Sequence, residues 1–152
     1  MTEVFRIKKN GRMAGQKPTY FGGGGAIETE LYESGYVENL ENVEAIRAII
    51  KGLNPAAQIV VTVSPVPLER TFSDKDIVVA NTEGKSILRA VLGEFDRRHD
   101  DVTYYPAFEM VSSLGEKAFM PGDLRHVNPS VVDLIMQSFI NAHLENRAPA
   151  VD

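Results

Sequence analysis

An aspartate and a histidine three residues apart carry the sharpest chemical signal in this sequence. Asp123 and His126 stand in the segment Gly122-Asp123-Leu124-Arg125-His126-Val127, just before a well-marked helix start. A carboxylate at this spacing can hold one ring nitrogen of the imidazole, which leaves the other nitrogen free as a general base. The segment follows the last expected strand, where α/β sheets bind ligands. The alternative is that Asp123 forms a turn and His126 is an ordinary surface residue.

The other reactive residue types give weaker signals. Ser64 follows an apolar run, but it lacks the flanking glycines of a nucleophile elbow, and Pro65 opposes the sharp turn that the elbow needs. The glycines at 22–25 predict a loop and lack the Lys-Ser/Thr of a phosphate-binding loop. With His99 and His143 far from His126 and no cysteine in the chain, we expect no metal site, disulfide or cofactor.

Composition predicts one packed domain spanning residues 1–152. Hydrophobic residues make up 43% of the 152 positions and charged residues 24%, which is typical of a folded soluble chain. The net charge of −5 disfavours binding to nucleic acid or to an anionic membrane. No segment reads as a signal peptide or reaches the roughly 18 apolar residues of a membrane span, so the expected location is cytoplasmic.

Hydrophobic periodicity and end signals predict three helices. The first extends to Leu53 with Asn39 as its cap, and the second runs from about Thr82 to Arg98 with Asn81 or Thr82 as its cap. The third begins at Pro129 with Asn128 as its cap. The apolar stripes expected to face the core are Leu40, Val43, Ile46 (or the stem of Arg47), Ile50 and Leu53 in the first helix and Ile87, Leu88, Val91, Leu92 and Phe95 in the second.

Strands are predicted between these helices. The β-branched run Gln58–Val63 lacks alternation, which indicates a strand buried on both faces, and Val102–Tyr105 reads as the next strand. Thr2–Ile7 is a candidate short strand, followed by a turn at Lys9-Asn10-Gly11. The remaining segments are expected to be loops or ambiguous, namely the rest of the Gly-rich start 1–38, residues 74–79, residues 112–127 and a frayed tail at 148–152.

Alternating helices and strands predict an α/β fold with a mostly parallel sheet. Such sheets are built from right-handed crossover units and carry helices on both faces. Two or three strands are few, because sheets usually have about four to six. The sequence therefore predicts either strands that escape detection or a domain that is part of a larger fold.

Four segments resemble, in the same order, motifs of the GSCFA family, a relative of the SGNH hydrolases. They cover about residues 54–139, and Gly84 departs from the family's usual serine. The weaker match Thr2-Glu3-Val4-Phe5 resembles a segment in the middle of that family's domain. The four stronger segments are Val61 to Leu68 (TVSPVPL), Val79 to Ala90 (ANxxSKSxLRA), Tyr104 to Val111 (YFPSYEIV) and Asp123 to Val127 (D-x-x-H).

The resemblance implies a three-layer α/β/α, flavodoxin-like fold and a Ser-His-Asp site that cleaves or transfers esters, including acyl groups on carbohydrate. Asp123 and His126 would be its acid and base. Neither Gly-Ser-Cys-Phe-Ala nor Gly-Asp-Ser occurs here, so the chain is expected to be the C-terminal portion of such a domain, without the nucleophile. The alternatives are a non-catalytic remnant, a binding module, or a subunit whose open sheet edge pairs with a second copy or a partner chain.

Overall fold

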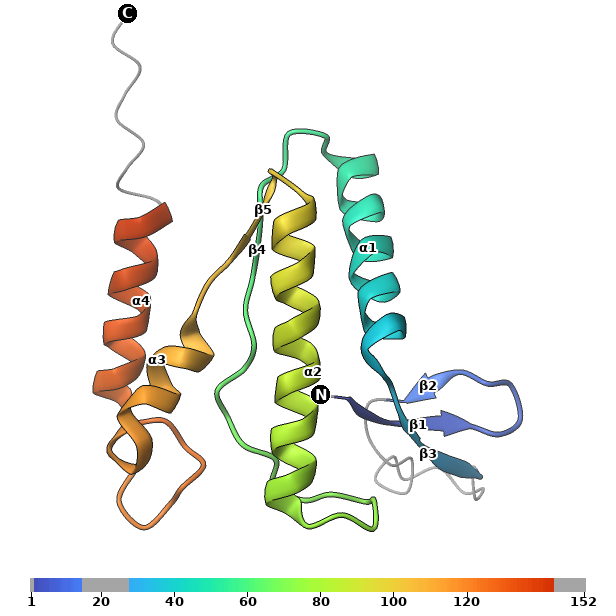
Figure 1. Ribbon diagram of the computed structural model, residues 1–152, viewed down its shortest axis with the longest axis horizontal. Helices are drawn as coiled ribbons and strands as arrows, with labels where there is room; N and C mark the ends of the chain where they lie inside the picture. Colours follow the sequence, from blue (N-terminus) through green and yellow to red (C-terminus); the bar gives the residue numbers. More distant parts are fainter. Residues whose placement is uncertain (1, 15–27, 144–152) are drawn as a thin grey trace, which may run out of the picture.

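A computed structural model describes residues 2–14 and 28–143 (Figure 1). The chain opens with an antiparallel sheet in the order β2-β1-β3, formed by Glu3–Ile7 (β1), Met13–Ala14 (β2) and Thr29–Glu33 (β3). Phe5 in the central strand is opposite Leu31 on one side and Ala14 on the other. The predicted turn is confirmed by Gly11, whose φ of 68° lies in the region that favours glycine.

Strand β3 was not predicted from the sequence. Within residues 1–38, the sequence predicted a strand only at residues 2–7. Strand β3 pairs with β1, which forms there, along its whole length. The glycines at 22–25 and the tail at 148–152 lie outside the described residues.

The second half contains the predicted parallel pairing. Ile59–Val61 (β4) lies beside Val102–Tyr104 (β5) in parallel register, and the two strands are joined through the long helix Ile77–Arg98 (α2). Helix Tyr36–Leu53 (α1) packs along α2 (Figure 1). In this view α1 and α2 lie to one side of the strand pair, and α3 and α4 lie to the other.

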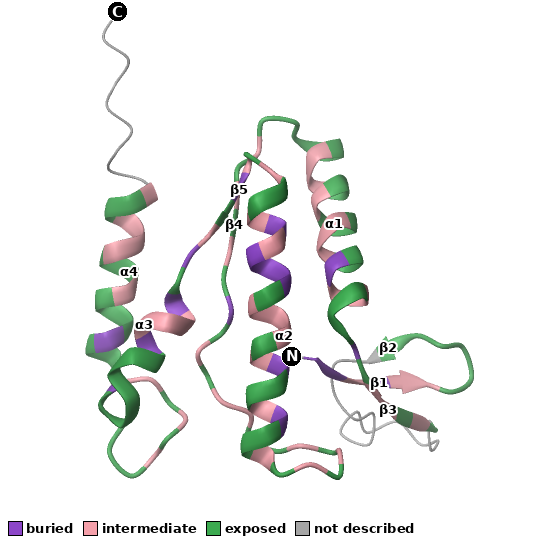
Figure 2. Cartoon of the chain, viewed as in Figure 1, coloured by how far each residue is buried: buried purple, intermediate pink, exposed green. Residues whose placement is uncertain are grey.

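The main core lies between α1, α2 and the β4–β5 pair. Val91 and Phe95 of α2 are fully buried there. Figure 2 shows several buried positions, in purple, along α2. The predicted stripe of α2 is confirmed by the core cluster, which contains Val91, Leu92 and Phe95 with Ile87 and Leu88 packed against them. In the stripe of α1, Leu40 and Val43 join the core, and Ile50 and the stem of Arg47 are partly buried. The prediction was wrong at Ile46 and Leu53, which are 55% and 84% exposed.

A second, smaller core joins the C-terminal elements. Helix Ala107–Leu114 (α3) leads into the 3₁₀ turn Gly115–Ala118 (η2), and helix Pro129–His143 (α4) packs back against α3. Val111, Ala118 and Val131 are buried together. The prediction of a plain loop over residues 112–127 was therefore wrong at its start, where α3 and η2 continue.

Helix α4 begins as predicted, whereas α1 and α2 begin earlier. Asn128 accepts hydrogen bonds from the amide and hydroxyl of Ser130. Helix α2 starts at Ile77 because the side chain of Asp76 accepts a hydrogen bond from Val78 N at 2.8 Å, so Asp76 is the cap. The predicted caps at 81 and 82 lie inside the helix. Asn39 lies in the first turn of α1, which begins at Tyr36.

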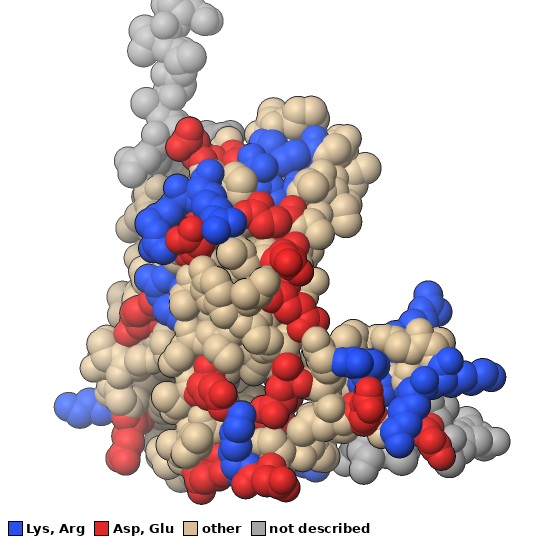
Figure 3. Space-filling view, turned by 45° about the vertical axis from the view of Figure 1, so that its right-hand side comes forward, with Lys and Arg blue, Asp and Glu red and all other residues tan. Residues whose placement is uncertain are grey.

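Ion pairs join the C-terminal half of α1 to the turn between α2 and β5. Asp101 binds Arg47 at 2.6 Å and Lys51 at 3.0 Å. These two cations lower the pKa of Asp101 to about 2. Figure 3 shows basic and acidic side chains next to one another on the side of the molecule in view.

The fold class is mixed α/β, as predicted, but most of the strand pairing described here is antiparallel. No helix among residues 2–14 and 28–143 is long and apolar enough to cross a membrane.

Candidate functional site

Asp123 and His126 meet in the structure. The two oxygens of the Asp123 carboxylate have different partners. Oδ2 is in direct contact with Nδ1 of the His126 ring, and Oδ1 accepts from the backbone amides of Arg125 (2.8 Å) and His126 (3.1 Å). The contact with the His126 ring lowers the pKa of Asp123 most, and the hydrogen bonds from the two backbone amides lower it further. The carboxylate is therefore held in its charged form, and it orients the imidazole.

The loop that carries the pair is closed at its base. Phe119 and Val127 form an antiparallel bridge, and Met120 N donates to His126 O at 2.8 Å. Gly122 turns the chain at the far end with a φ of 77°, a value that favours glycine. The side chain of His126 remains 70% exposed and that of Asp123 39% exposed. The expected position just after a strand was inexact, because α3 and η2 separate β5 from this loop.

A second loop lies against the first. The segment from Thr62 to Asp76, between β4 and α2, reaches the site at Glu69, whose Oε2 lies 3.3 Å from Nη1 of Arg125. The pKa of Glu69 is lowered, first by its hydrogen bond with the Arg70 side chain and then by the nearby charges of Arg125 and His126. Sequence reasoning missed Glu69 and Arg125, and no sequence pattern links two residues so far apart in the chain.

Polar residues of α2 hold this second loop in place. Lys85 Nζ donates to the carbonyl of Ser64 and to that of Val66, the latter at 2.9 Å, and its partial burial lowers its pKa. Asn81 Oδ1 accepts from Leu68 N at 3.0 Å. These contacts give a structural role to the Val79 to Ala90 motif, because they fasten it to the Val61 to Leu68 motif.

The N-terminal sheet holds the other end of the same loop. The buried carboxylate of Glu3 accepts from the Thr71 hydroxyl (2.6 Å) and from Phe72 N (3.1 Å). Thr2 approaches α2 so closely that a Cβ added to Gly84 would lie 2.7 Å from its hydroxyl. The absence of a side chain at position 84 therefore accommodates Thr2.

A third contact ties α2 to the Tyr104 to Val111 motif. Glu109 accepts from Arg89 Nε at 2.5 Å and from the Tyr104 hydroxyl at 2.8 Å, and the Arg89 guanidinium lies 4.0 Å from the centre of the Tyr104 ring. Burial, and then the bond to Glu109, raises the pKa of Tyr104 to about 12. The polar residues of the resembling motifs thus bind one another and form a scaffold around the two loops.

Among the described residues, no hydroxyl group is hydrogen-bonded to the Asp123–His126 pair. Nε2 of His126 makes no hydrogen bond in residues 2–14 and 28–143, and Ser64 Oγ accepts from Val66 N at 3.3 Å instead. His99 pairs with Glu44 of α1 at 2.7 Å, and the ring of His143 packs against that of Phe139. Within this part of the chain no group of three or more acidic or histidine residues could hold a metal ion.

Comparison with known proteins gives one match. A family model described as the GSCFA family matches residues 1–139. No curated protein and no solved structure matches significantly.

Proposed function

The chain belongs to the GSCFA family, and on that premise we propose that Asp123 and His126 are the acid–base part of an SGNH-like esterase or acyl-transfer site. The substrates would be esters, including O-acyl groups on carbohydrate. The nucleophilic hydroxyl would come from a polypeptide segment other than the described residues. In this proposal the chain corresponds to the C-terminal portion of a three-layer α/β/α domain.

The arrangement around the imidazole is the observation that carries the proposal. Asp123 contacts Nδ1 of His126, and Nε2 has no hydrogen-bond partner among the described residues. The side chain of His126 is 70% exposed. Nε2 can accept the proton of a hydroxyl as its oxygen attacks an ester carbonyl, and then return that proton to the leaving alcohol. The charged carboxylate of Asp123 stabilises the imidazolium that exists between these steps.

The position of the ring proton tests this role. At a pH where the ring of His126 is neutral, we expect its proton on Nδ1, because only that nitrogen faces the carboxylate. In Asp123→Asn the side-chain oxygen can keep the bonds to the two backbone amides, so its NH₂ group faces Nδ1 and forces the proton to Nε2. Ring ¹⁵N chemical shifts distinguish the two tautomers directly.

Glu69→Gln is the matched control, since it removes a nearby carboxylate that touches Arg125 but not the ring. It should leave the proton on Nδ1. If the proton of the unaltered protein lies on Nε2, His126 has no free nitrogen to act as a base, and the proposal fails.

A non-catalytic subunit is the second candidate, and the strand pair favours it. Sheets made only of parallel strands are normally covered on both faces and contain more than two strands. Here the parallel sheet in the described residues has two strands, and Val60 in β4 is 40% exposed. A second copy or a partner chain could add a strand to this sheet.

This candidate predicts self-association that depends on β4. Val60→Lys places a charge on the strand, so it should shift the protein toward monomer in sedimentation or light-scattering measurements. Val66→Lys is the control, because Val66 is 39% exposed but lies outside the strand. A strictly monomeric unaltered protein at about 100 μM would contradict pairing between copies.

A further inference from the structure

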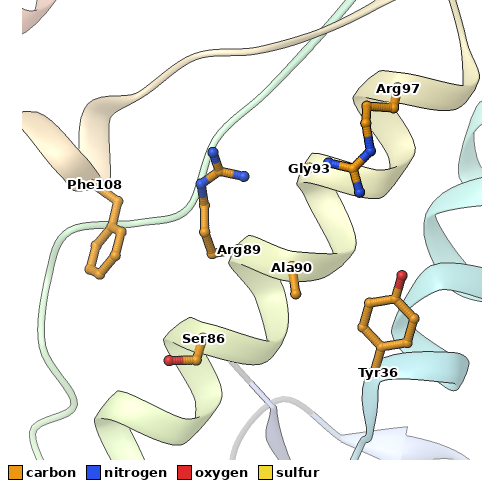
Figure 4. A pocket seen from close by; sticks show the side chains of 7 residues that line it. All are labelled: Tyr36, Ser86, Arg89, Ala90, Gly93, Arg97 and Phe108. Carbon is orange, nitrogen blue, oxygen red and sulfur yellow. The ribbon is translucent and has the colours of Figure 1, made fainter.

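We infer that the surface pocket over Gly93 of α2 binds a small molecule that bears an oxyanion, either a carboxylate or a phosphate group. The pocket has a volume of about 460 Å³, which is in the range of small-molecule sites. Two arginines, a serine and two aromatic side chains line it together with Ala90 and Gly93 (Figure 4). These five side chains are Arg89, Arg97, Ser86, Tyr36 and Phe108.

Two guanidinium groups converge on one point in this pocket. A Cβ added to Gly93 would lie 2.6 Å from Nη1 of Arg89 and 3.7 Å from Nη1 of Arg97. The two Nη1 atoms therefore lie near each other beside Gly93, and one anion in the pocket between them is within reach of both. Guanidinium N–H groups bind carboxylate and phosphate oxygens strongly, and a shared anion would offset the repulsion between the two cations.

Existing ion pairs hold the two arginines but leave these nitrogen atoms available. Arg89 uses Nε for Glu109 at 2.5 Å, and Arg97 uses Nη2 for Glu94 at 2.6 Å. Neither Nη1 atom makes a hydrogen bond within residues 2–14 and 28–143. The side chains are 41% and 69% exposed, so a ligand can reach them from solvent.

The remaining lining explains why the ligand would be larger than a free ion. Phe108 stands across the pocket from Tyr36, and the Ser86 side chain lies one turn before Arg89 (Figure 4). Aromatic walls bury the apolar part of a small molecule, and a hydroxyl adds one polar contact. The anion would bind beside Gly93, where the Nη1 atoms of Arg89 and Arg97 both lie close to the helix backbone. This inference does not depend on the proposed esterase function.

Titration of the full chain with inorganic phosphate, and separately with malonate, tests the inference. Ionic strength is kept constant with sodium chloride, and the backbone amide of Gly93 and the Nε–H of Arg97 are followed by NMR. We expect saturable shifts with at least one of the two anions, and the better ligand identifies phosphate or carboxylate as the group recognised. If neither anion gives a saturable shift at these positions, the inference is wrong.

Arg97→Gln should weaken that binding about tenfold, the loss expected for one charge-assisted hydrogen bond. Arg98→Gln is the matched control: it removes the same charge from the next position, which does not line the pocket. Gly93→Ala should also weaken binding, because the added Cβ would lie 2.6 Å from Nη1 of Arg89 and displace that guanidinium. It should still fold, because the end of the arginine side chain can move and alanine is favoured over glycine inside helices. Equal affinity in Arg97→Gln and the unaltered protein would overturn the inference.

Discussion

Replacing Phe95 with alanine is expected to lower the free energy of unfolding by about 3–5 kcal/mol, the usual cost of removing a buried phenylalanine ring. Phe95 is 2% exposed and lies at the centre of the main core with Val91 and Val102. Its ring also meets the edge of His99, with ring centres 5.3 Å apart. Because α1, α2 and the strand pair all border this core, no single element can close the cavity by itself.

Thermal or urea unfolding followed by circular dichroism measures this loss. For a domain of this size about 1 kcal/mol corresponds to roughly 2–4 °C, so the midpoint should fall by roughly 6–20 °C. The control Phe72→Ala removes the same atoms at a site that is 46% exposed, where the ring touches Phe5 at its edge. A loss for Phe95→Ala no larger than for Phe72→Ala would contradict the core described above.

Helix α2 illustrates how far local patterns predict this fold. Its core stripe is predictable because apolar residues recur at helical spacing where they face the strand pair. The first turn of α2 cannot be predicted in this way, because Ile77, Val78 and Val79 form a β-branched run that resembles a strand. Val78 and Val79 are 68% and 55% exposed, so this turn has no buried face to produce a helical period. The side-chain cap at Asp76 decides the outcome.

Strand β3 shows the corresponding limit for sheets. Its residues Thr29–Glu33 mix charged and apolar positions, and its partner β1 lies more than twenty residues earlier in the chain. Pairing across such a distance leaves no mark on the short sequence windows from which strands are predicted. In α1, similarly, Ile46 and Leu53 follow the apolar spacing, yet the described residues do not cover them.

In the candidate site, too, contacts within one short segment can be predicted from the sequence, whereas contacts between distant segments cannot. Asp123 and His126 could be paired from the sequence because a closed loop of a few residues brings them together. The contact between Glu69 and Arg125 could not be predicted, because it depends on how two loops pack against each other. Lys85 and Glu109 stood in recognisable motifs, but only the structure shows that they bind the Ser64 carbonyl and Arg89.

If the acid–base proposal is correct, His126→Gln should reduce acyl transfer from p-nitrophenyl acetate to water or to an added small alcohol. A positioned general base contributes about 10²–10⁴ in rate, and we expect a loss of about 10², the lower end of that range. The lower end applies because, among the described residues, no hydroxyl is bonded to Nε2, so in this assay the water or the added alcohol stands in for the proposed nucleophilic hydroxyl. Release of p-nitrophenolate gives the rate.

Free imidazoles also react with activated esters, so the controls must remove a histidine as well. His99→Gln and His143→Gln each do so, at sites where the ring pairs with Glu44 or packs on Phe139 rather than facing Asp123. Both should keep most of the rate, whereas Asp123→Asn should lose activity with His126→Gln because the ring proton then occupies Nε2. Equal rates in all four variants and the unaltered protein would mean that the contact between Asp123 and His126 only closes a loop.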